Sequence, residues 1–224
     1  MDKIAEAVSI VSGARVKSDS CLVFYSGGKD SLCVMDLASK CFRRTVGVFM
    51  YFVPGLQCVE KQLDFARARW PGVEILKIPH WVFFRCYKNG IYRIPGRGDE
   101  DIPDVKILHL YHYVMNRTGI NFIATGAKAA DSIWRKRNLN STKNYPFLLT
   151  PLKSWNKYDV LYYLRKNEIP LPDSDGKTSG GIDLTAPPIY WLYDKHKPDY
   201  DRLAAIFPFI GAKIKQRELY GGSK

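Results

Sequence analysis

The stretch Tyr25-Ser26-Gly27-Gly28-Lys29-Asp30-Ser31 decides how this sequence is interpreted. An apolar run at residues 21–25 leads into it, and residues 31–42 after it carry apolar side chains at helical spacing. Two adjacent glycines permit a tight turn close to a ligand, and the start of a helix supplies N–H groups and a positive dipole end. The stretch therefore predicts a phosphate-binding loop between a strand and a helix.

Individual side chains of the loop strengthen that prediction. Ser26 and Ser31 add hydroxyl donors, and Lys29 adds a full positive charge. Asp30 can either cap the helix or hold a Mg²⁺ ion. The loop is not a Walker loop, because the string G-x-x-x-x-G-K-[ST] does not occur in this sequence.

Strand-like and helix-like runs alternate on both sides of the loop. The strand-like runs are residues 21–25, 46–52, 73–78 and 121–125, and the helix-like runs are residues 31–42, 57–70 and 104–118. Nearly all-apolar strands that alternate with helices indicate a parallel sheet covered on both faces. We predict a doubly wound α/β domain whose ligands lie at the carboxyl ends of the strands, where the loop and Gly126 both fall.

The chain changes character after residue 150, where prolines and glycines become frequent. We predict a nucleotide-binding α/β domain at residues 1–150 and a mostly helical, loop-rich C-terminal extension at residues 151–224, packed on the domain. Residues 87–103 are expected to form a long, mobile surface loop, with a functional loop as the alternative. Residues 178–183 form a second glycine-rich loop, with a lid over the substrate as the alternative to an ordinary loop.

Composition narrows the possible partners. The 34 basic residues outnumber the 22 acidic ones, and the net charge of +12 favours polyanions such as nucleotides or nucleic acid, although solvated lysines would give the same balance. Five cysteines without a C-x-x-C pair argue against a disulfide framework or a zinc ribbon, so we expect a reducing, cytoplasmic compartment. No apolar run approaches the ~20 residues of a membrane span. The oligomeric state and a partner enzyme stay open.

The loop resembles the pyrophosphate-binding loop, S-G-G-x-D-S, of the N-type ATP pyrophosphatases and adenine-nucleotide α-hydrolases. Two further elements narrow the resemblance. Residues 125–137 are similar to the G-x-R-x-x-E-S-x-x-R element of the branch that contains phosphoadenylyl-sulfate (PAPS) reductases and the small subunit of ATP sulfurylase. Residues 150–164 are similar to the same branch's P-L-x-x-W-x-x-x-D-V-x-x-Y-L segment. The resemblance implies a five-stranded parallel sheet.

The resemblance also implies roles for individual residues. Lys128 takes the usual arginine position of the second element, Asp131 the usual glutamate, and Arg135 the final arginine. It implies an enzyme that cleaves ATP between the α- and β-phosphates and adenylates an acceptor such as sulfate, a nucleic acid or a metabolite. The expected catalytic residues are Lys29, Asp30 and Arg135, with Asp30 holding Mg²⁺. The expected nucleotide-binding residues are Ser26, Gly27, Gly28, Lys29, Ser31, Gly126, Lys128 and Arg137.

One departure from the family argues against a reductase reaction by this chain alone. Sulfonucleotide reductases attack sulfate with a cysteine near the C-terminus, whereas no cysteine follows Cys86 here. Thiol reduction by this chain alone is therefore not expected. A PAPS reductase that borrows a partner's thiol, and a non-catalytic nucleotide-binding accessory protein, stay as alternatives.

Several other side chains are expected to cap helices, pack or face solvent rather than act in the site. Asn156 is expected to cap a helix, and Asp36 and Asp64 are expected to be solvated. The scattered histidines are treated as surface or packing residues. Four aromatic residues are expected in the core, with stacking on bases as the alternative: Tyr111, Tyr113, Trp134 and Trp155.

Overall fold

A five-stranded, all-parallel sheet forms the centre of the protein. The computed structural model describes residues 2–141, 145–173 and 182–221. The sheet has the strand order β3-β2-β1-β4-β5. Its strands are β1 (Ser20–Phe24), β2 (Arg44–Tyr51), β3 (Glu74–Pro79), β4 (Ile123–Ala124) and β5 (Leu148–Leu149). The predicted fold class is confirmed, and so are the four predicted strands; β5, with two residues, is too short for periodicity to reveal.

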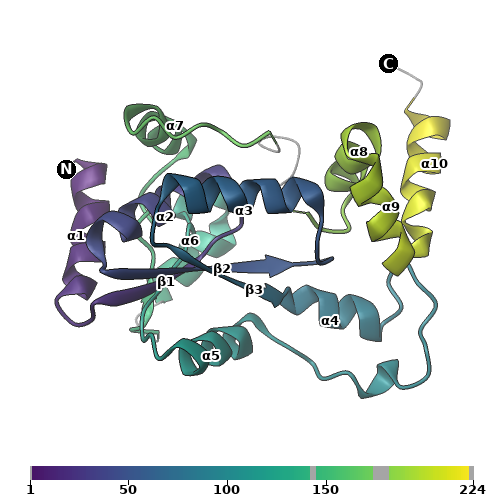
Figure 1. Cartoon of the computed structure of the whole chain (residues 1–224), viewed down its shortest axis with the longest axis horizontal. Helices are drawn as coiled ribbons and strands as arrows, with labels where there is room; N and C mark the ends of the chain where they lie inside the picture. Colours follow the sequence, from purple (N-terminus) through teal and green to yellow (C-terminus); the bar gives the residue numbers. More distant parts are fainter. Residues whose placement is uncertain (1, 142–144, 174–181, 222–224) are drawn as a thin grey trace.

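Helices cover both faces of this sheet (Figure 1). Helices α2 and α3 lie along one face and α5 lies on the other, while α8 to α10 gather at one end of the molecule. The helices are α1 (Lys3–Arg15), α2 (Lys29–Cys41), α3 (Gln57–Arg69), α4 (Trp81–Lys88), α5 (Ile107–Thr118), α6 (Ile133–Ser141), α7 (Lys157–Lys166), α8 (Ala186–Lys195), α9 (Lys197–Ile206) and α10 (Gly211–Tyr220).

Strand β1 shows why the sheet is apolar on both sides. Cys21 and Val23 belong to the larger core cluster with α2, whereas Leu22 between them belongs to the second cluster, with Leu110 and Val114 of α5. Successive side chains of a strand point to opposite faces, so a strand covered on both faces has apolar residues throughout. This burial fixes β1 in the middle of the sheet and places the loop that follows it at the sheet's carboxyl edge.

Helix α2 is buried on nearly all sides, and one sequence expectation fails there. Asp36 is 1% exposed rather than solvated. Its carboxylate accepts hydrogen bonds from the Trp70 indole (3.0 Å), the Tyr163 hydroxyl (2.7 Å) and Lys40 (2.6 Å), which joins α2 to α3 and α7. Buried carboxylates persist when several donors satisfy them. Asp64 has a side chain that is 71% exposed, as expected.

The start of α7 follows the sequence prediction. The Asn156 side chain accepts hydrogen bonds from the backbone N–H groups of Tyr158 and Asp159, at 2.8 and 3.2 Å. Asp159 also pairs with Lys3 of α1 at 2.6 Å. Helix α7 is thus capped by Asn156 and linked to α1 by an ion pair.

The C-terminal helices are tied to the α/β layer by one buried carboxylate. Asp199 of α9 is 2% exposed and accepts hydrogen bonds from the backbone N–H groups of Gln57 (2.7 Å) and Cys58 (2.8 Å) at the start of α3. Because Leu56, the residue before α3, cannot cap a helix itself, Asp199 satisfies these donors from a distant part of the chain. The domain boundary at residue 150 stays a prediction.

The two predicted loops differ in what the structure describes. The first loop, predicted at residues 87–103, is shortened because α4 extends to Lys88. Arg93 pairs with Asp99, and its guanidinium carbon lies 3.8 Å from the centre of the Tyr87 ring. A short 3₁₀ turn, Asp99–Asp101, follows. Of the second loop, residues 178–181 lie outside the described residues. Within the described part of the chain, no helix is long and apolar enough to cross a membrane.

Candidate functional site

The loop between β1 and α2 has the backbone geometry of an anion-binding turn. Gly27 has φ of +76°, a conformation that costs a residue with a side chain on the order of 1 kcal/mol or more. A Cβ there would also approach Gln62 Oε1 to 2.5 Å. Gly28 occupies the N-cap position of α2, where it has no side-chain acceptor to offer the first turn. The N–H groups and the dipole of α2 are therefore directed toward the cavity beyond the loop.

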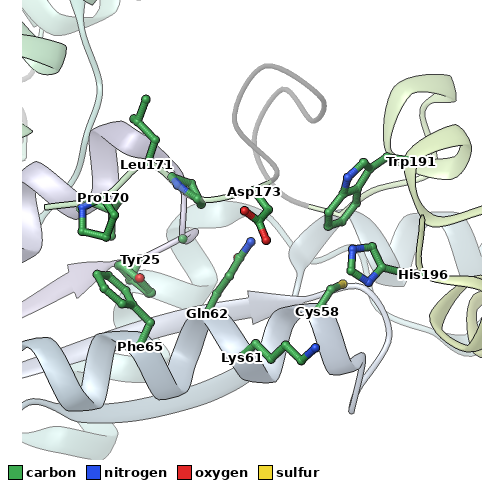
Figure 2. A pocket seen from close by; sticks show the side chains of 13 residues that line it. Tyr25, Cys58, Lys61, Gln62, Phe65, Pro170, Leu171, Asp173, Trp191 and His196 are labelled. Carbon is green, nitrogen blue, oxygen red and sulfur yellow. The ribbon is translucent and has the colours of Figure 1, made fainter. Parts of the chain in front are cut away.

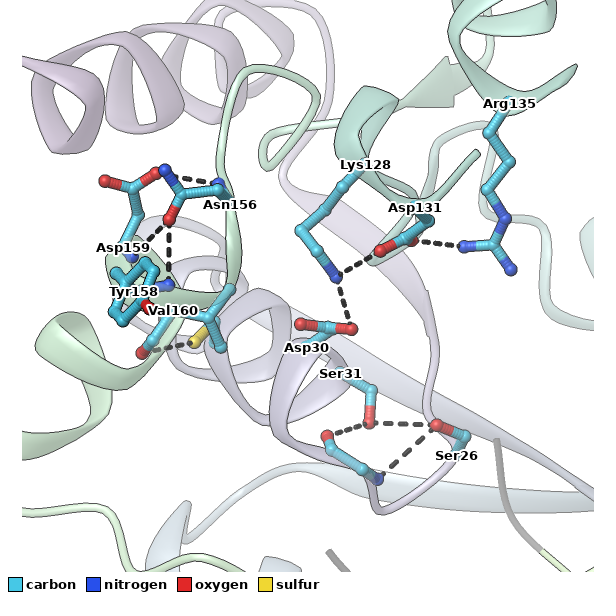
Figure 3. Close-up of polar contacts among 12 residues, drawn as sticks. Ser26, Asp30, Ser31, Lys128, Asp131, Arg135, Asn156, Tyr158, Asp159 and Val160 are labelled. Carbon is cyan, nitrogen blue, oxygen red and sulfur yellow. Dashed lines mark hydrogen bonds and ion pairs between the residues drawn. The ribbon is translucent and has the colours of Figure 1, made fainter. Parts of the chain in front are cut away.

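Hydroxyl groups hold the loop together from within (Figure 3). The Ser31 hydroxyl donates to the carbonyl of Gly28 at 2.8 Å, and the Ser26 hydroxyl donates to Ser31 Oγ at 3.3 Å. The N–H of Gly28 in turn donates to Ser26 Oγ at 3.4 Å. Ser26 and Ser31 thus shape the turn in the absence of a ligand, and both also line the cavity in front of it.

Gly126 brings the loop after β4 against the start of α2. A Cβ on Gly126 would lie 3.0 Å from the Cβ of Asp30 and 3.2 Å from its carbonyl carbon. Close backbone approach, rather than a positive φ, is what requires glycine here. Strands β1 and β4 are neighbours, and the chain crosses from one side of β1 to the other between them, so this is the topological switch point where α/β sheets bind ligands.

A chain of ion pairs runs from the loop to α6. Lys128 Nζ lies 2.5 Å from Asp30 Oδ2 and 3.1 Å from Asp131 Oδ1, and Arg135 lies 2.7 Å from Asp131 Oδ2 (Figure 3). Lys128 is 3% exposed, whereas the side chain of Arg135 is 49% exposed. Two carboxylates balance the charge of the buried Lys128 ammonium, and Lys128 in turn fixes the positions of Asp30 and Asp131. Arg135 is more exposed and can reach a ligand.

These residues border one large cavity, which we call the charged cavity. Its volume is about 730 Å³. Among the described residues that line it, four are cations and two are carboxylates: Lys29, Lys128, Arg135 and Lys157, against Asp30 and Asp131. The predicted residues Ser26, Ser31 and Gly126 line it as well. An excess of positive charge beside a helix N-terminus suits a phosphorylated ligand.

Three predicted residues, Gly27, Gly28 and Arg137, lie outside this lining. Gly28 holds the N-cap position of α2. Gly27 borders a different cavity, behind the loop. Helix α6 contributes Arg135 to the described lining of the charged cavity but not Arg137, which is exposed on the same helix. A nucleotide-binding role of Arg137 therefore has no geometric support here and stays a prediction.

Sequence reasoning missed most of the apolar side of the charged cavity, where it had considered only Tyr111, as a core residue with base stacking as the alternative. Phe24 and Met50 come from the ends of β1 and β2, and Ile107 and Tyr111 come from α5. The rings of Phe24 and Tyr111 meet edge to face, with centres 4.7 Å apart. Burial raises the pKa of Tyr111 to about 12, so its hydroxyl stays protonated. These side chains offer a surface on which a planar base can pack. No motif marks them, because they converge from separate elements.

Asp30 passes a simple test as a ligand for a divalent cation. Its Oδ2 pairs with Lys128, while its Oδ1 is buried and has no hydrogen-bond partner among the described residues. An orphaned carboxylate oxygen is the kind of donor that Mg²⁺ prefers, and Mg²⁺ sites commonly use one or two carboxylates plus phosphates and water. No cluster of three or more metal-ligating side chains occurs among the described residues. Asp30 thus fits Mg²⁺ as a single protein ligand beside a bound nucleotide.

A second cavity, which we call the apolar cavity, lies at the ends of β2 and β3 and has a volume of about 300 Å³. Ser26 and Met50 line both cavities. The apolar cavity has no lysine or arginine among its described lining residues, and its polar groups include His80 and Asp183. Burial lowers the pKa of His80 below its ordinary value, while Asp183 works in the opposite direction. This cavity suits an uncharged group.

A third, smaller cavity of about 230 Å³ lies behind Gly27, between α3 and the C-terminal helices. Figure 2 shows Gln62 of α3 pointing into it, with Trp191 and His196 on the opposite side. Its described lining has one lysine, Lys61, and one carboxylate, Asp173, so it has no excess of positive charge. The charged cavity is therefore the best candidate for phosphate groups.

Comparison with known proteins identifies the fold. No protein-family profile matches the sequence, and none of the curated proteins matches it. Two solved structures are similar in fold, each with a TM-score of 0.51. The PAPS reductase of Candida auris, in a phosphate complex, shares 15% identity over 78% of this chain and 87% of its own. The U34-tRNA thiolase NcsA of Methanococcus maripaludis, with a [4Fe-4S] cluster, shares 13% over 97% and 79%.

Both structures belong to the adenine-nucleotide α-hydrolase, or PP-loop, superfamily. At this level of identity the similarity shows the fold alone. The protein therefore has the adenine-nucleotide α-hydrolase-like fold that its loop predicted.

Proposed function

We propose that this protein is an enzyme that binds an adenine nucleotide in the charged cavity and catalyses displacement at the α-phosphorus, with pyrophosphate as the leaving group. The observation that carries the proposal is the meeting of the Ser26–Ser31 loop, the start of α2 and four cationic side chains in one cavity at the switch point of the sheet. The fold, which is shared with nucleotide-using enzymes, supports it.

The parts of the site divide between the two ends of the nucleotide. The loop, with Lys29 and the N–H groups of the first turn of α2, would hold the pyrophosphate end. Arg135, half-exposed and fixed by Asp131, would grip the α-phosphate or an anionic acceptor with paired hydrogen bonds. Phe24, Met50 and Tyr111 would pack against the adenine.

The reaction needs little beyond placement and charge. A nucleophilic oxygen of the acceptor forms a bond to the α-phosphorus, and the bond from that phosphorus to the bridging oxygen of the β-phosphate breaks. The electron pair of that bond leaves with pyrophosphate, and the proton of a hydroxyl acceptor passes to solvent. Lys29 and Arg135 would stabilise the negative charge that builds up on the phosphoryl oxygens. A Mg²⁺ ion held by Asp30 would neutralise further charge on the leaving group.

The cysteines favour this chemistry over thiol-based reduction. No cysteine is among the described residues that line the charged cavity. Cys58 and Cys86 line the two neighbouring cavities, and burial raises the pKa of both thiols, that of Cys58 to about 12. A protonated, buried thiol is a poor nucleophile. A reductase reaction at this site would depend on a thiol supplied by another protein.

A single set of assays tests the proposal. The protein is incubated with labelled ATP and Mg²⁺, alone, with sulfate and with an oligonucleotide, and AMP and pyrophosphate are measured. We expect turnover that Lys29→Ala lowers about 100-fold or more, by loss of one charge-assisted contact to the phosphate groups in the transition state. Lys61→Ala, which removes a cation from the small cavity behind Gly27, should change the rate about twofold at most.

Two results would replace the proposal. Tight ATP binding that depends on Lys29 without any turnover would make the protein a nucleotide-binding module. Release of sulfite from PAPS in the presence of thioredoxin, but no cleavage of ATP, would make it a reductase that uses a partner's thiol.

A further inference from the structure

Helix α6 begins with a run of exposed side chains. Every residue from 133 to 137 is exposed, and Ile133 and Trp134 are 74% and 72% exposed. The expectation that Trp134 belongs to the core is therefore wrong. Short helices in water usually depend on a packed apolar face, whereas the first turn of α6 places Ile133 and Trp134 in solvent. The start of α6 thus offers an exposed surface that combines apolar and basic side chains.

Two contacts hold the start of α6. Arg135 pairs with Asp131, and the N–H of Arg135 donates to the Ser132 hydroxyl at 3.1 Å. These contacts connect α6 to the turn that carries Lys128, below the charged cavity. The other side chains in the first turns of α6 are exposed to solvent: Ile133, Trp134, Lys136 and Arg137.

A second exposed pair of residues, one cation and one aromatic residue, lies at the start of α7. Lys157, at the start of α7, lines the charged cavity together with Arg135 of α6. Tyr158, the next residue, is 81% exposed. The two helix starts thus flank the same cavity, each with cations and a large exposed aromatic ring. We call this set of residues the rim surface: Ile133, Trp134, Lys136, Arg137, Lys157 and Tyr158.

We infer that the rim surface binds a single-stranded nucleic acid and holds it across the mouth of the charged cavity. Cations follow a phosphate backbone, and exposed aromatic rings stack on unpaired bases, which is how proteins bind single strands without reading their sequence. A duplex hides the faces of its bases and would leave Trp134 and Tyr158 without stacking partners. The net charge of +12 adds long-range attraction for such a strand.

The inference names the acceptor class of the proposed function and rests on that function in this respect. An acceptor held at the rim would present a base or a strand end to the nucleotide in the cavity. Carboxylates beside the rim surface do not oppose a polyanion strongly, because Asp30 and Asp131 are paired with Lys128, and Asp159 is paired with Lys3.

The test measures binding of end-labelled oligo(dT) and oligo(rU) strands of about 20 nucleotides by fluorescence anisotropy, beside a duplex of equal length. The variants are Trp134→Ala and Lys136→Glu. Matched controls come from the exposed part of α10, at the other end of the molecule in Figure 1: Tyr220→Ala, whose ring is 78% exposed, and Lys215→Glu. Urea unfolding of each variant shows whether it is folded, and ATP binding to each is measured in parallel.

We expect Trp134→Ala and Lys136→Glu each to weaken strand binding about tenfold in about 0.1 M salt, with little change for either control. Lys136→Glu should also lower the salt slope of binding by about 0.7, the value for one single-strand phosphate contact. Strand binding should change the tryptophan fluorescence of the parent protein and not that of Trp134→Ala.

Equal losses in the α10 controls, an unchanged affinity of Trp134→Ala, or equally tight binding of the duplex would overturn the inference. The parallel ATP measurement separates the two proposals. Strand binding that fails while ATP is bound and cleaved removes only the nucleic-acid acceptor. ATP binding that fails while the strand binds at the rim surface removes the proposed function and leaves the rim surface as a nucleic-acid site.

Discussion

The charged cavity and the apolar cavity share a boundary at Ser26 and lie at the same edge of one sheet, yet their chemistry is opposite. The charged cavity has four cations and two carboxylates among its described lining residues. The apolar cavity has no lysine or arginine in its described lining, which is mostly apolar and includes His80 and one carboxylate, Asp183. Position at the carboxyl edge of a parallel sheet therefore indicates where ligands bind, but not which kind of ligand each strand end accepts.

The difference follows from what covers the strand ends. At β1 and β4 the chain diverges, and the start of α2 and the turn before α6 face each other across the gap, bringing N–H groups and cations with them. At β2 and β3 the strands are covered by α4 and by residues 182–185, whose side chains include Ile182 and Leu184. One side of the Ser26–Ser31 loop thus has the charges that suit phosphate groups, and the other side is mostly apolar.

The largest effect should come from removing the buried cation of the charged cavity. Lys128→Met would leave Asp30 and Asp131 close together and without their shared ammonium. Loss of one partner from a buried ion pair costs on the order of 3 kcal/mol. We expect a decrease of about this size in the free energy of unfolding, measured by urea denaturation.

Lys157→Met is the matched control, since Lys157 lines the same cavity but is exposed. It should change the free energy of unfolding by about 0.5 kcal/mol or less. Equal stability of the two variants would show that the ion-pair chain does not order the charged cavity, and would weaken the contrast with the apolar cavity.

The loop that separates the cavities should respond next, and unequally at its two glycines. Gly27→Ala forces a side chain onto a residue with φ of +76° and against Gln62, at a cost of about 1 to 2 kcal/mol. Gly28 has ordinary φ of −80°, and its added Cβ would meet only Ser26 Oγ at 3.5 Å. Gly28→Ala should therefore cost about 0.5 kcal/mol, as expected for alanine at an N-cap position.

Thermal unfolding of both variants distinguishes these costs. If Gly28→Ala were the more harmful substitution, the turn would have a different backbone from the one described, and the positive φ would not lie at Gly27.

How far the sequence predicts this molecule depends on whether a feature is local. The loop, the strand before it and the helix after it lie in one stretch of chain, so turn chemistry and periodicity identified them together. Asn156 as a helix cap is local in the same sense and was predicted correctly. The fold class followed from repeating that local pattern along the chain.

Features that depend on distant contacts were not predictable in the same way. Asp36 looks like a solvated helix residue until Trp70 and Tyr163 supply donors from two other helices. Lys128 looks like a free cation until Asp30 meets it from the first loop. The site was found from its motif, whereas its apolar wall and its internal charge balance required the three-dimensional arrangement.

The smallest effect should come from His80, the titratable group that best marks the apolar cavity. Its Nδ1 accepts a hydrogen bond from the Val82 N–H at 3.1 Å and so caps α4, and its ring lies beside those of Phe52 and Trp81, with centres 5.1 and 5.9 Å away. A neutral ring is needed for that hydrogen bond, since a protonated imidazole has no acceptor. Burial agrees with this and holds the pKa of His80 below about 6.5, the ordinary value.

The direction of the pH effect follows from that depressed pKa. Above about pH 6.5 His80 is neutral in both the folded and the unfolded chain, and it adds no pH dependence. As the pH falls below this value the unfolded chain takes up the proton first, so the folded state loses stability until the pH passes the lower, folded pKa. His80→Asn keeps an N-cap acceptor and cannot titrate, so its free energy of unfolding should decrease less between about pH 7 and about pH 5 than that of the parent protein. Parallel curves for the two proteins would mean that His80 is hydrated in the folded state, and the cavity at the ends of β2 and β3 would then not be the apolar counterpart of the charged one.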